Sequence, residues 1–503
     1  MSFRVRSFFV ENGDFSTPIV RLSKNEKADN SNYFTVLIGN NGVGKSRFLV
    51  NIIDAFMEVH ERKRRFNFDY TLEYELLGEI FRVERKRYQK LEGRIHSAIK
   101  TEGLGGGAPN KIIAITTSLS DKFPMDGKNE KRDDSSKKGN FYTYLGVRNR
   151  VGAASNRALM DKAISLMLSS IHKVSNNGDY REIFDYLNYE PIIKLDYEVA
   201  SISVNDLSGF IVDGEVFKKT ILERSERRGG FRYELVRRML ETKDYSYWDD
   251  LAKAYNFIVD DVISKKQRKE FTILLNFSIE NSNREMTQLG INENKLYILL
   301  EELRRFELVR GPIVKLYKKG GGEEFDFNDA SSGEASILST LIALIPELED
   351  NSLIVVDEPE ISLHPSWQYR YVNLLDKIIS KKSGCHILIA THSHFIVSDL
   401  PIGRSNIVHL KKSSNSSIDV NYVEQETHGL AAEDILLNIF DMPSTRNYYL
   451  SQQVSEALEL LASGDKKNIR YKNLIDKFNS YLPNLKKVDP LYDVLFKLVS
   501  LGS

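Results

Sequence analysis

Residues 39–46, GNNGVGKS, combine glycine, lysine and serine in a pattern that could hold phosphates. Glycines allow backbone N–H groups to curl around an anion, and the start of a following helix adds partial positive charge. Lys45 would reach the outer phosphates of a nucleotide, and the Ser46 hydroxyl would be a ligand for Mg²⁺. The apolar run FTVLI before the loop predicts the strand that this pattern requires. The predicted phosphate-binding residues are Gly39, Asn40, Asn41, Gly42, Val43, Gly44, Lys45 and Ser46.

Two further apolar runs end in side chains that could take part in phosphate chemistry. LIVVDEPE places Asp357 and Glu358 directly after four apolar residues, where burying carboxylates is costly without a cation nearby. We expect Asp357 to support Mg²⁺ and Glu358 to position or deprotonate a water molecule. HILIATHSHF places His392 where it could contact a terminal phosphate or hold Glu358, whereas His394 is expected to be structural or exposed. A strand that runs into an acidic turn remains the simpler interpretation of 353–360 alone.

The segment DASSGEAS, residues 329–336, precedes the apolar helix predicted from SILSTLIALIPELED. A plain helix N-cap explains it well, with Ser331 or Ser332 as the capping residue and Glu334 beside it. The same residues could instead present hydroxyl and N–H groups to a phosphate. The two interpretations are compatible.

Composition limits the class of protein. The 503 residues include 70 Lys+Arg and 70 Asp+Glu, so the net charge is zero and a general polyanion binder is not indicated. Cys385 is the single cysteine, which excludes a disulfide or a cysteine zinc site within the chain and favours a reducing compartment. The sequence has no apolar run of the roughly 20 residues that a bilayer requires and no signal-peptide pattern. We therefore expect a soluble, intracellular protein that makes no membrane contact.

Periodicity predicts the order of elements. The N-terminal part should contain strands at 3–10, 19–22 and 34–38, a helix at 45–60 and further charged helix. A buried strand is expected at 111–119 and an exposed loop at 126–140. The remaining predictions are a helical stretch at 157–308, a hairpin around KKGGG at 312–329, alternating helices and strands from 335 to about 425, and a helical tail.

These motifs together resemble the ATP-binding-cassette (ABC) ATPase heads of SMC and DNA-repair ATPases. The segments 330–334, 361–365 and His392 resemble the signature loop, D-loop and switch histidine of that family. The resemblance implies an α/β fold, namely a mixed sheet with a phosphate loop and helices on both faces, interrupted by a helical insertion and followed by a helical tail. The implied domains are 1–156 and 310–428 for the head, 157–309 for the insertion and 429–503 for the C-terminal region.

In this family the signature loop contacts the ATP that a second head holds. The resemblance therefore implies a homodimer or higher oligomer with ATP at the interface. It implies that Ser331, Ser332, Gly333 and Glu334 contact the partner's nucleotide. Two departures stand out: Ser332 replaces the commoner glycine, and the usual Q-loop glutamine is missing, so Ser118, Asp121 or a neighbour would replace it.

A narrower resemblance, to the PtuA-like ATPases of Septu and retron phage-defence systems of prokaryotes, rests on segments 111–124, 144–148, 357–368, 391–401 and 426–430. It implies an ATPase that regulates or scaffolds a separate nuclease of the HNH type, PtuB-like, and in a retron a reverse transcriptase with its msDNA. The chain itself shows no paired Asp-x-Asp and no H-N-H cluster in the expected pattern. The alternative is an SMC-like DNA-repair or chromosome ATPase that acts directly on DNA.

Four basic clusters bear on this alternative. They could be solvated helix faces or could contact nucleic acid. The clusters lie at 61–65, 84–90, 223–238 and 265–269.

Overall fold

The structure is a computed structural model. It describes residues 2–24, 30–61, 68–89, 95–102, 107–118, 121–125, 141–148, 156–170, 178–200, 213–228, 231–264, 270–277, 285–286, 291–413, 417–442, 448–465, 468–485 and 489–502. The predicted loop at 126–140 and the basic residues 62–65 and 265–269 lie outside the described residues. The chain divides into two compact units, Met1–Gly429 and Leu430–Ser503, and each is described by itself.

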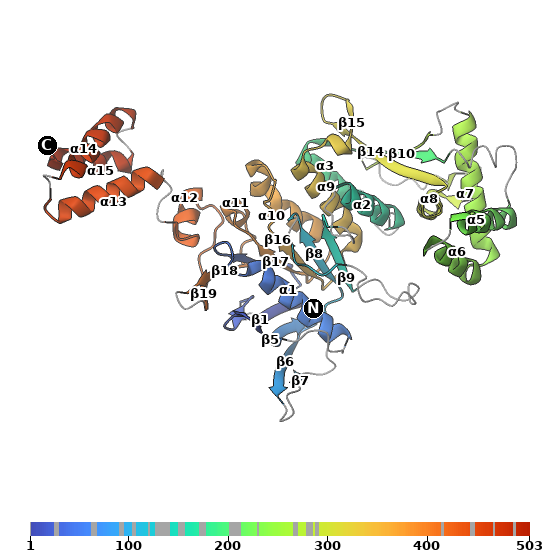
Figure 1. Cartoon of the computed structure of the whole chain (residues 1–503), viewed down its shortest axis with the longest axis horizontal. Coiled ribbons are helices and arrows are strands. Elements are labelled where there is room, and N and C mark those ends of the chain that lie inside the picture. Colours follow the sequence, from blue (N-terminus) through green and yellow to red (C-terminus); the bar gives the residue numbers. More distant parts are fainter. Residues whose placement is uncertain are drawn as a thin grey trace. The chain divides into compact units, whose positions relative to one another are not determined.

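A seven-stranded sheet lies at the centre of the first unit, with the order β19-β18-β4-β17-β16-β8-β9 (Figure 1). All neighbouring strands are parallel except β18 and β19. The middle strands are fully buried, as is typical of a parallel sheet covered on both faces. The bounds are β4 (Tyr33–Ile38), β8 (Ile112–Thr116), β9 (Tyr142–Gly146), β16 (Leu353–Asp357), β17 (His386–Ala390), β18 (Ser405–Lys412) and β19 (Ile418–Val423).

One face of this sheet is covered by α1 (Lys45–Glu61) and then by an antiparallel sheet. Phe48 and Phe56 of α1 meet Phe8 and Phe3 of the antiparallel sheet edge to face, with ring centroids 5.5 Å apart in both pairs. The main apolar core therefore lies between two sheets, with α1 inside it. The antiparallel sheet contains β1 (Phe3–Asn12), β2 (Phe15–Ser16), β3 (Val20–Arg21), β5 (Asp69–Leu76), β6 (Glu79–Gln89) and β7 (Ile95–Glu102).

Strands β5 to β7 correct the prediction of further charged helix after α1. In DYTLEYEL the residues Tyr70, Leu72 and Tyr74 are buried, and the residues between them are partly exposed. This alternation has the period of two that belongs to a strand, and the many charges on the outward side conceal it.

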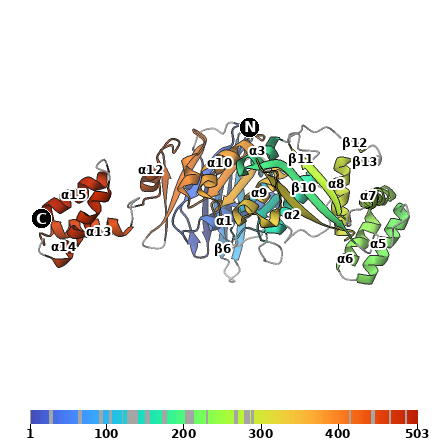
Figure 2. The same cartoon turned by 90° about the horizontal axis from the view of Figure 1, so that it is seen from above.

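Helices lie on the other face of the parallel sheet (Figures 1 and 2). Two of them, α9 (Ser332–Leu344) and α10 (Pro365–Ile379), lie on either side of β16 in the sequence. Almost every residue of α9 is buried, because α2 and α3 also pack on it. The remaining bounds are α2 (Asn156–Ser170), α3 (Gly178–Leu187) and α11 (His394–Ser398).

A third sheet, antiparallel with the order β11-β10-β14-β15, adjoins these helices. The predicted hairpin around KKGGG is confirmed as β14 and β15. The stretch at 157–308, predicted to be helical, also contains strands: β10 and β11 lie within it and pair with each other. The bounds are β10 (Tyr189–Val199), β11 (Glu270–Asn276), β14 (Val309–Lys318), β15 (Glu324–Asp326), β12 (Glu285–Met286), β13 (Ile291–Asn292), α5 (Gly214–Arg228), α6 (Phe231–Thr242), α7 (Tyr245–Ser264) and α8 (Glu293–Arg305).

The second unit is helical, as predicted. Its small core contains Tyr471, Leu474, Phe478 and Leu495. No helix in the described ranges of either unit is both long and apolar enough to cross a membrane. The bounds are α12 (Ala432–Asp434), a π-helical turn (Ile435–Ile439), α13 (Tyr448–Ala462), α14 (Ile469–Tyr481) and α15 (Pro490–Gly502).

A buried histidine joins the antiparallel sheet that contains β1 to the seven-stranded sheet. The Nδ1 atom of His386 accepts the backbone N–H of Val5 at 2.9 Å, so Nε2 of the neutral ring carries the proton and donates to the Thr35 hydroxyl, also at 2.9 Å. Burial lowers the pKa of His386 well below 6.5, and the nearby charge of Arg4 adds to this effect. The folded protein therefore keeps this ring neutral when the unfolded chain would protonate it.

We predict that His386→Leu lowers the free energy of unfolding by about 1–3 kcal/mol at pH 8, because two buried polar groups lose their partner. Below a pH of about 6.5 the unfolded wild-type chain binds a proton at His386 that the folded chain rejects, so wild-type stability falls by up to about 1.4 kcal/mol per pH unit. The variant lacks this loss, so the difference should narrow as the pH falls. Chemical denaturation at several pH values measures it, with His428→Leu as the exposed control. A difference that is independent of pH would contradict the assignment.

Candidate nucleotide-binding site

The loop 39–44 joins β4 to α1 in a conformation that requires glycine. Gly39 and Gly44 have φ values of 146° and 102°. A Cβ atom on Gly39 would lie 2.2 Å from the backbone oxygen of Leu410, and one on Gly44 would lie 2.2 Å from the ring of Phe15. Gly42, at φ 78°, has open space around it. The loop is therefore held closely at both ends, while Asn40, Asn41 and Gly42 are exposed and Val43 is buried.

Lys45 points back into this loop. Its Nζ atom donates to the backbone oxygen of Gly39 at 2.9 Å and to Nε2 of His392 at 2.7 Å. The residue is only 5% exposed. Burial lowers the pKa of Lys45 to about 8, although Glu358, Glu360 and Asp357 oppose this shift. The ammonium group is thus a poorly solvated cation that an anion in the loop would stabilise.

Ser46 and Asp357 meet at the carboxyl ends of the parallel strands, as the predicted metal site requires. The Ser46 hydroxyl donates to Oδ1 of Asp357 at 3.0 Å. Burial raises the pKa of Asp357 to about 7, with Glu358 adding to the rise and Ser46 opposing it. Within the described ranges no three His, Cys, Asp or Glu residues form a group that could hold a metal by themselves. Two oxygen donors in this position suit Mg²⁺, which commonly takes its other ligands from phosphates and water.

Glu358 and His392 face each other across the ends of β16 and β17. Glu358 has a positive φ of 50°, and its backbone is fixed by hydrogen bonds to Ala390 and from the Thr117 hydroxyl. Its carboxylate lies 3.8 Å from Nε2 of His392, and the two side chains are 29% and 31% exposed. Burial, with help from Lys45, lowers the pKa of His392 to about 4, so the ring is neutral. A partly exposed carboxylate in this position has access to water.

The sequence argument missed Glu360. Its carboxylate accepts hydrogen bonds from the backbone N–H of His392 and, at 2.8 Å, from the hydroxyl of Thr391. The only signal in the sequence is a third acidic residue two positions after Glu358.

The signature-like segment caps α9. The Ser331 hydroxyl accepts the N–H of Glu334 at 3.3 Å, and the Glu334 carboxylate accepts the N–H of Ser331 at 3.0 Å. Burial would raise the pKa of Glu334, but hydrogen bonds from Ser331 and Tyr189 outweigh burial and lower it. Ser331 and Ser332 are exposed, and Gly333 packs so closely on Ser362 that a Cβ would lie 2.1 Å from the Ser362 oxygen.

This segment is separate from the phosphate loop of its own chain. In the described ranges no hydrogen bond or ion pair joins 331–334 to Lys45, Ser46 or His392. The structure therefore brings the loop, Asp357, Glu358 and His392 together and leaves the capping segment outside that group.

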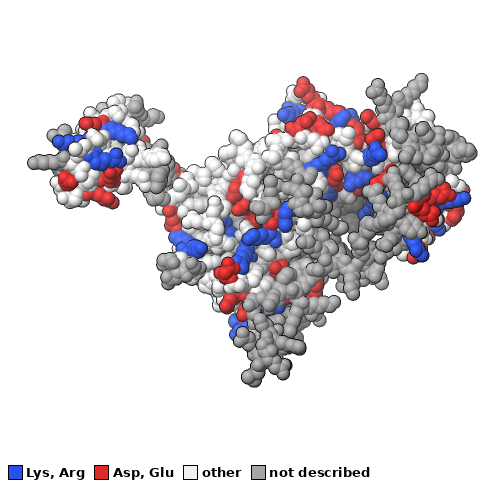
Figure 3. Space-filling view, in the orientation of Figure 1, with Lys and Arg blue, Asp and Glu red and all other residues white. Residues whose placement is uncertain are grey.

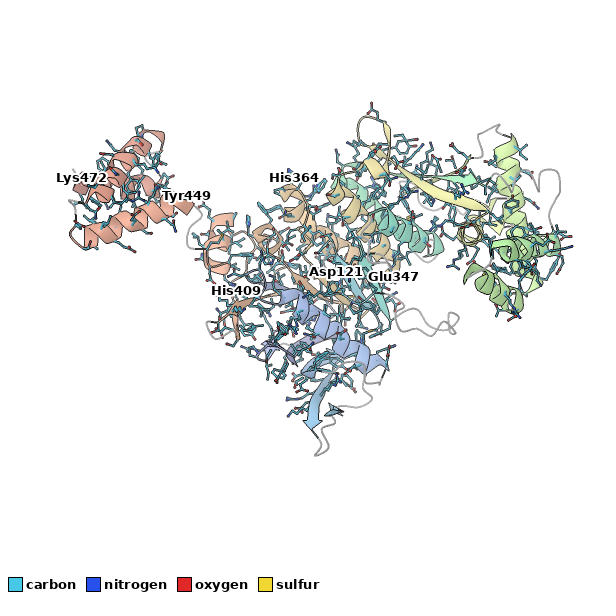
Figure 4. All side chains as sticks on the ribbon, in the orientation of Figure 1. Asp121, Glu347, His364, His409, Tyr449 and Lys472 are labelled. Atoms are coloured by element: carbon cyan, nitrogen blue, oxygen red, sulfur yellow. The ribbon has the colours of Figure 1, made fainter. Side chains whose placement is uncertain are left out.

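Asp121, one of the proposed Q-loop replacements, has other partners than the residues of this group. Its carboxylate is bound by both Nε and Nη2 of Arg148, at 2.8 and 2.7 Å, and by the Tyr144 hydroxyl at 2.8 Å (Asp121 is labelled in Figure 4). A carboxylate held in this way is structural. Ser118 is buried and stays a prediction, while its neighbour Thr117 contacts the backbone of Glu358. The ring of His394 contacts that of Phe395 at the start of α11, with centroids 4.0 Å apart and the planes tilted by 36°, which suits a local structural role.

An open hollow of about 600 Å³ lies beside the loop. Asp14 on its wall binds Arg47 of α1 at 2.7 Å, and the adjoining Phe15 covers Gly44. The hollow is lined by residues 14, 16–19, 417–420 and 422.

Parts of this chain are similar to known proteins. A protein-family model described as "AAA domain, putative AbiEii toxin, Type IV TA system" matches residues 208–398. The chain is 29% identical over 131 residues to Protein ea59 of Escherichia phage lambda, covering 25% of this chain and 24% of that protein. It is 23% identical over 262 residues to Septu protein PtuA of Bacillus thuringiensis, covering 48% of this chain and 62% of that protein. The chain thus matches less than two-thirds of the length of either relative.

Solved structures give a weaker likeness. The SMC head domain from Thermotoga maritima has a TM-score of 0.34 at 11% identity. The alignment covers 84% of this chain and 100% of that domain's chain. The Smc head from Pyrococcus furiosus, bound to the C-terminal domain of ScpA, has a TM-score of 0.33 at 10% identity, covering 84% of this chain and 96% of its own. Values this low add nothing to the fold described above.

We predict that Gly39→Ala destabilises the protein by about 1–3 kcal/mol more than Gly42→Ala does. Both substitutions force alanine into a left-handed conformation, but only at position 39 does the new Cβ collide with backbone, that of Leu410. Chemical denaturation of the two variants measures the difference. Equal losses would show that the loop moves freely away from β18.

Proposed function

We propose that this chain is an ATP-binding and ATP-hydrolysing subunit with an ABC-type head. The observation that carries the proposal is the convergence of four groups at one edge of a parallel sheet. These groups are the loop 39–46, the Ser46–Asp357 pair, Glu358 and His392. These groups follow β4, β17 and β16, which lie side by side in the sheet. In the sequence, the loop precedes the other groups by more than 300 positions.

The chain's own groups have distinct parts in this function. Backbone N–H groups of 40–46 bind the phosphates, and Lys45 leaves His392 and Gly39 to pair with them. Ser46 and Asp357 hold Mg²⁺, which would neutralise phosphate charge. Glu358 orients and deprotonates the attacking water, and His392, released by Lys45, contacts the terminal phosphate. The hollow lined by 14–19 and 417–422 receives the nucleoside.

A second copy of the chain completes the site in this proposal. Ser331 and Ser332 are exposed at the start of α9, whose N–H groups and helix dipole favour an anion. Among the described residues no hydrogen bond or ion pair joins them to the phosphate loop of their own chain, which supports a phosphate held by a partner. The active form is then a homodimer or higher oligomer with ATP at the interface.

The biological role follows from similarity to Septu protein PtuA. The chain would regulate or scaffold a separate nuclease in phage defence, PtuB-like and of the HNH type, with a reverse transcriptase and msDNA in a retron. Residues 1–156 and 310–428 form the head, 157–309 the insertion and 429–503 a C-terminal region. The cytoplasm of a bacterium is its proposed location.

Charge pairing argues against the alternative of an SMC-like ATPase acting directly on DNA. In the basic cluster at 84–90, Arg85 is buried and bound to Glu58 at 2.9 Å, and Lys86 is paired with Glu84 at 2.7 Å. On the face shown in Figure 3, the described basic and acidic side chains are interspersed. Nucleic-acid contact then depends on residues outside these pairs.

Two variants separate ATP binding from hydrolysis. Lys45→Ala should abolish ATP binding, because it removes the cation that pairs with the phosphates. Glu358→Gln should keep ATP affinity but lower kcat by about 100-fold or more, because the amide cannot take a proton. Equilibrium binding of ATP and steady-state phosphate release measure the two effects. Normal ATP affinity in folded Lys45→Ala, or normal turnover in Glu358→Gln, would refute the corresponding role.

Mixing variants tests the composite site. Ser331→Arg should leave ATP binding intact, because the phosphate loop is untouched, yet block the ATP-dependent dimer and hydrolysis. A mixture of Ser331→Arg and Lys45→Ala chains can form one intact site, built from the loop of the first and the signature segment of the second. We therefore expect the mixture to recover part of the ATP hydrolysis that neither variant shows alone. Loss of ATP affinity in folded Ser331→Arg would place this serine in its own chain's site.

A further inference from the structure

The loop 391–393, which carries His392, is held by a chain of hydrogen bonds from the turn that follows β16. One oxygen of Glu360 accepts the backbone N–H of His392, and the other accepts the hydroxyl of Thr391 at 2.8 Å. The same hydroxyl oxygen accepts the N–H of Ser393 at 2.9 Å. The Ser393 hydroxyl donates to the side-chain oxygen of Gln368 at 2.7 Å. All three residues of the loop are therefore held in position.

The turn that presents Glu360 is itself fixed. Glu358 and Ser362 on either side of it have φ values of 50° and 62°, which non-glycine residues rarely adopt. The backbone N–H of Leu363 donates to the backbone oxygen of Glu360 at 3.1 Å. The side-chain amide of Gln368 donates to the backbone oxygen of Leu363 at 3.0 Å. A turn with so few alternative conformations can position a neighbouring loop.

A carboxylate suits this position better than an amide. Glu360 accepts two hydrogen bonds through two oxygens, and glutamine has only one acceptor oxygen. One of the two donors is the main chain of His392 itself. A change at Glu360 would therefore move the backbone from which the imidazole projects, and with it the 2.7 Å contact to Lys45 and the 3.8 Å approach to Glu358.

We propose that Glu360 is a positioning residue that fixes the main chain at His392, so that the imidazole lies between Lys45 and Glu358. In this role Glu360 acts through His392 and not on the nucleotide itself. The inference rests on the proposed ATPase function only where turnover is measured. The placement of the imidazole can be tested in the chain without nucleotide.

The first test observes the ring directly. In protein labelled with ¹⁵N-histidine, His392→Ala identifies the His392 ring signals by their loss. In the wild type, Nε2 accepts from Lys45, so Nδ1 carries the proton and the two nitrogens have the shifts of that tautomer. Glu360→Gln and Thr391→Val should both move these signals, and Glu360→Gln more. The matched control is Glu349→Gln, a half-exposed carboxylate at the other end of β16, which should leave them in place. Unmoved His392 signals in folded Glu360→Gln would overturn the proposal.

The second test uses a double-mutant cycle on turnover. Glu360→Gln should lower kcat by about 10- to 100-fold through misplacement of His392, while ATP affinity changes about twofold at most. In the His392→Ala background the same substitution should have no further effect, because the group it positions is gone. Losses of kcat that multiply would assign Glu360 another role and overturn the proposal. If the wild type hydrolyses no ATP, the ATPase proposal fails, and the ring signals still decide the role of Glu360.

Discussion

The structure of the first unit depends on burying charged groups at the end of an apolar sheet. Asp357 is 2% exposed and Lys45 is 5% exposed, and burial moves the pKa of each toward neutrality, to about 7 and about 8. Both groups need partners there, and the protein supplies them from distant parts of the chain, namely Ser46 for Asp357 and His392 for Lys45. A nucleotide with Mg²⁺ would offer stronger partners to the same two groups.

These groups are held in position because the phosphate loop packs closely against other elements at both of its ends. The backbone of β18 touches Gly39, and Phe15 from the antiparallel sheet touches Gly44. Helix α1, which begins with Lys45, is packed between the two sheets by Phe48 and Phe56. The antiparallel sheet therefore does more than cover the core. It fixes the start of α1, and so it fixes the direction of the N–H groups that we propose bind phosphate.

The sequence was sufficient wherever a local pattern determined the structure. Short apolar runs ending in polar residues predicted β16 and β17, and their parallel pairing brings Asp357 and His392 to one edge. Local patterns failed where partners are distant. The alternation in β5 to β7 was hidden by charges, and β10 is a strand because it pairs with β11 and β14. The bonds from Arg148 to Asp121 and from the main chain of His392 to Glu360 join residues 27 and 32 positions apart, which no local pattern reveals.

The two interpretations of the segment at 331–334 do not compete for the same atoms. In the capping box, the Ser331 hydroxyl oxygen accepts the N–H of Glu334, which uses a lone pair and leaves the hydroxyl proton available. The Glu334 carboxylate accepts hydrogen bonds from the N–H of Ser331 and from the hydroxyl of Tyr189. Its charge is therefore partly neutralised within the chain. The capped helix therefore presents a hydroxyl donor and a positive dipole end at an exposed surface. Structural capping is therefore compatible with the proposed contact to a phosphate on a second chain, and Tyr189 of β10 links the capped segment to the third sheet.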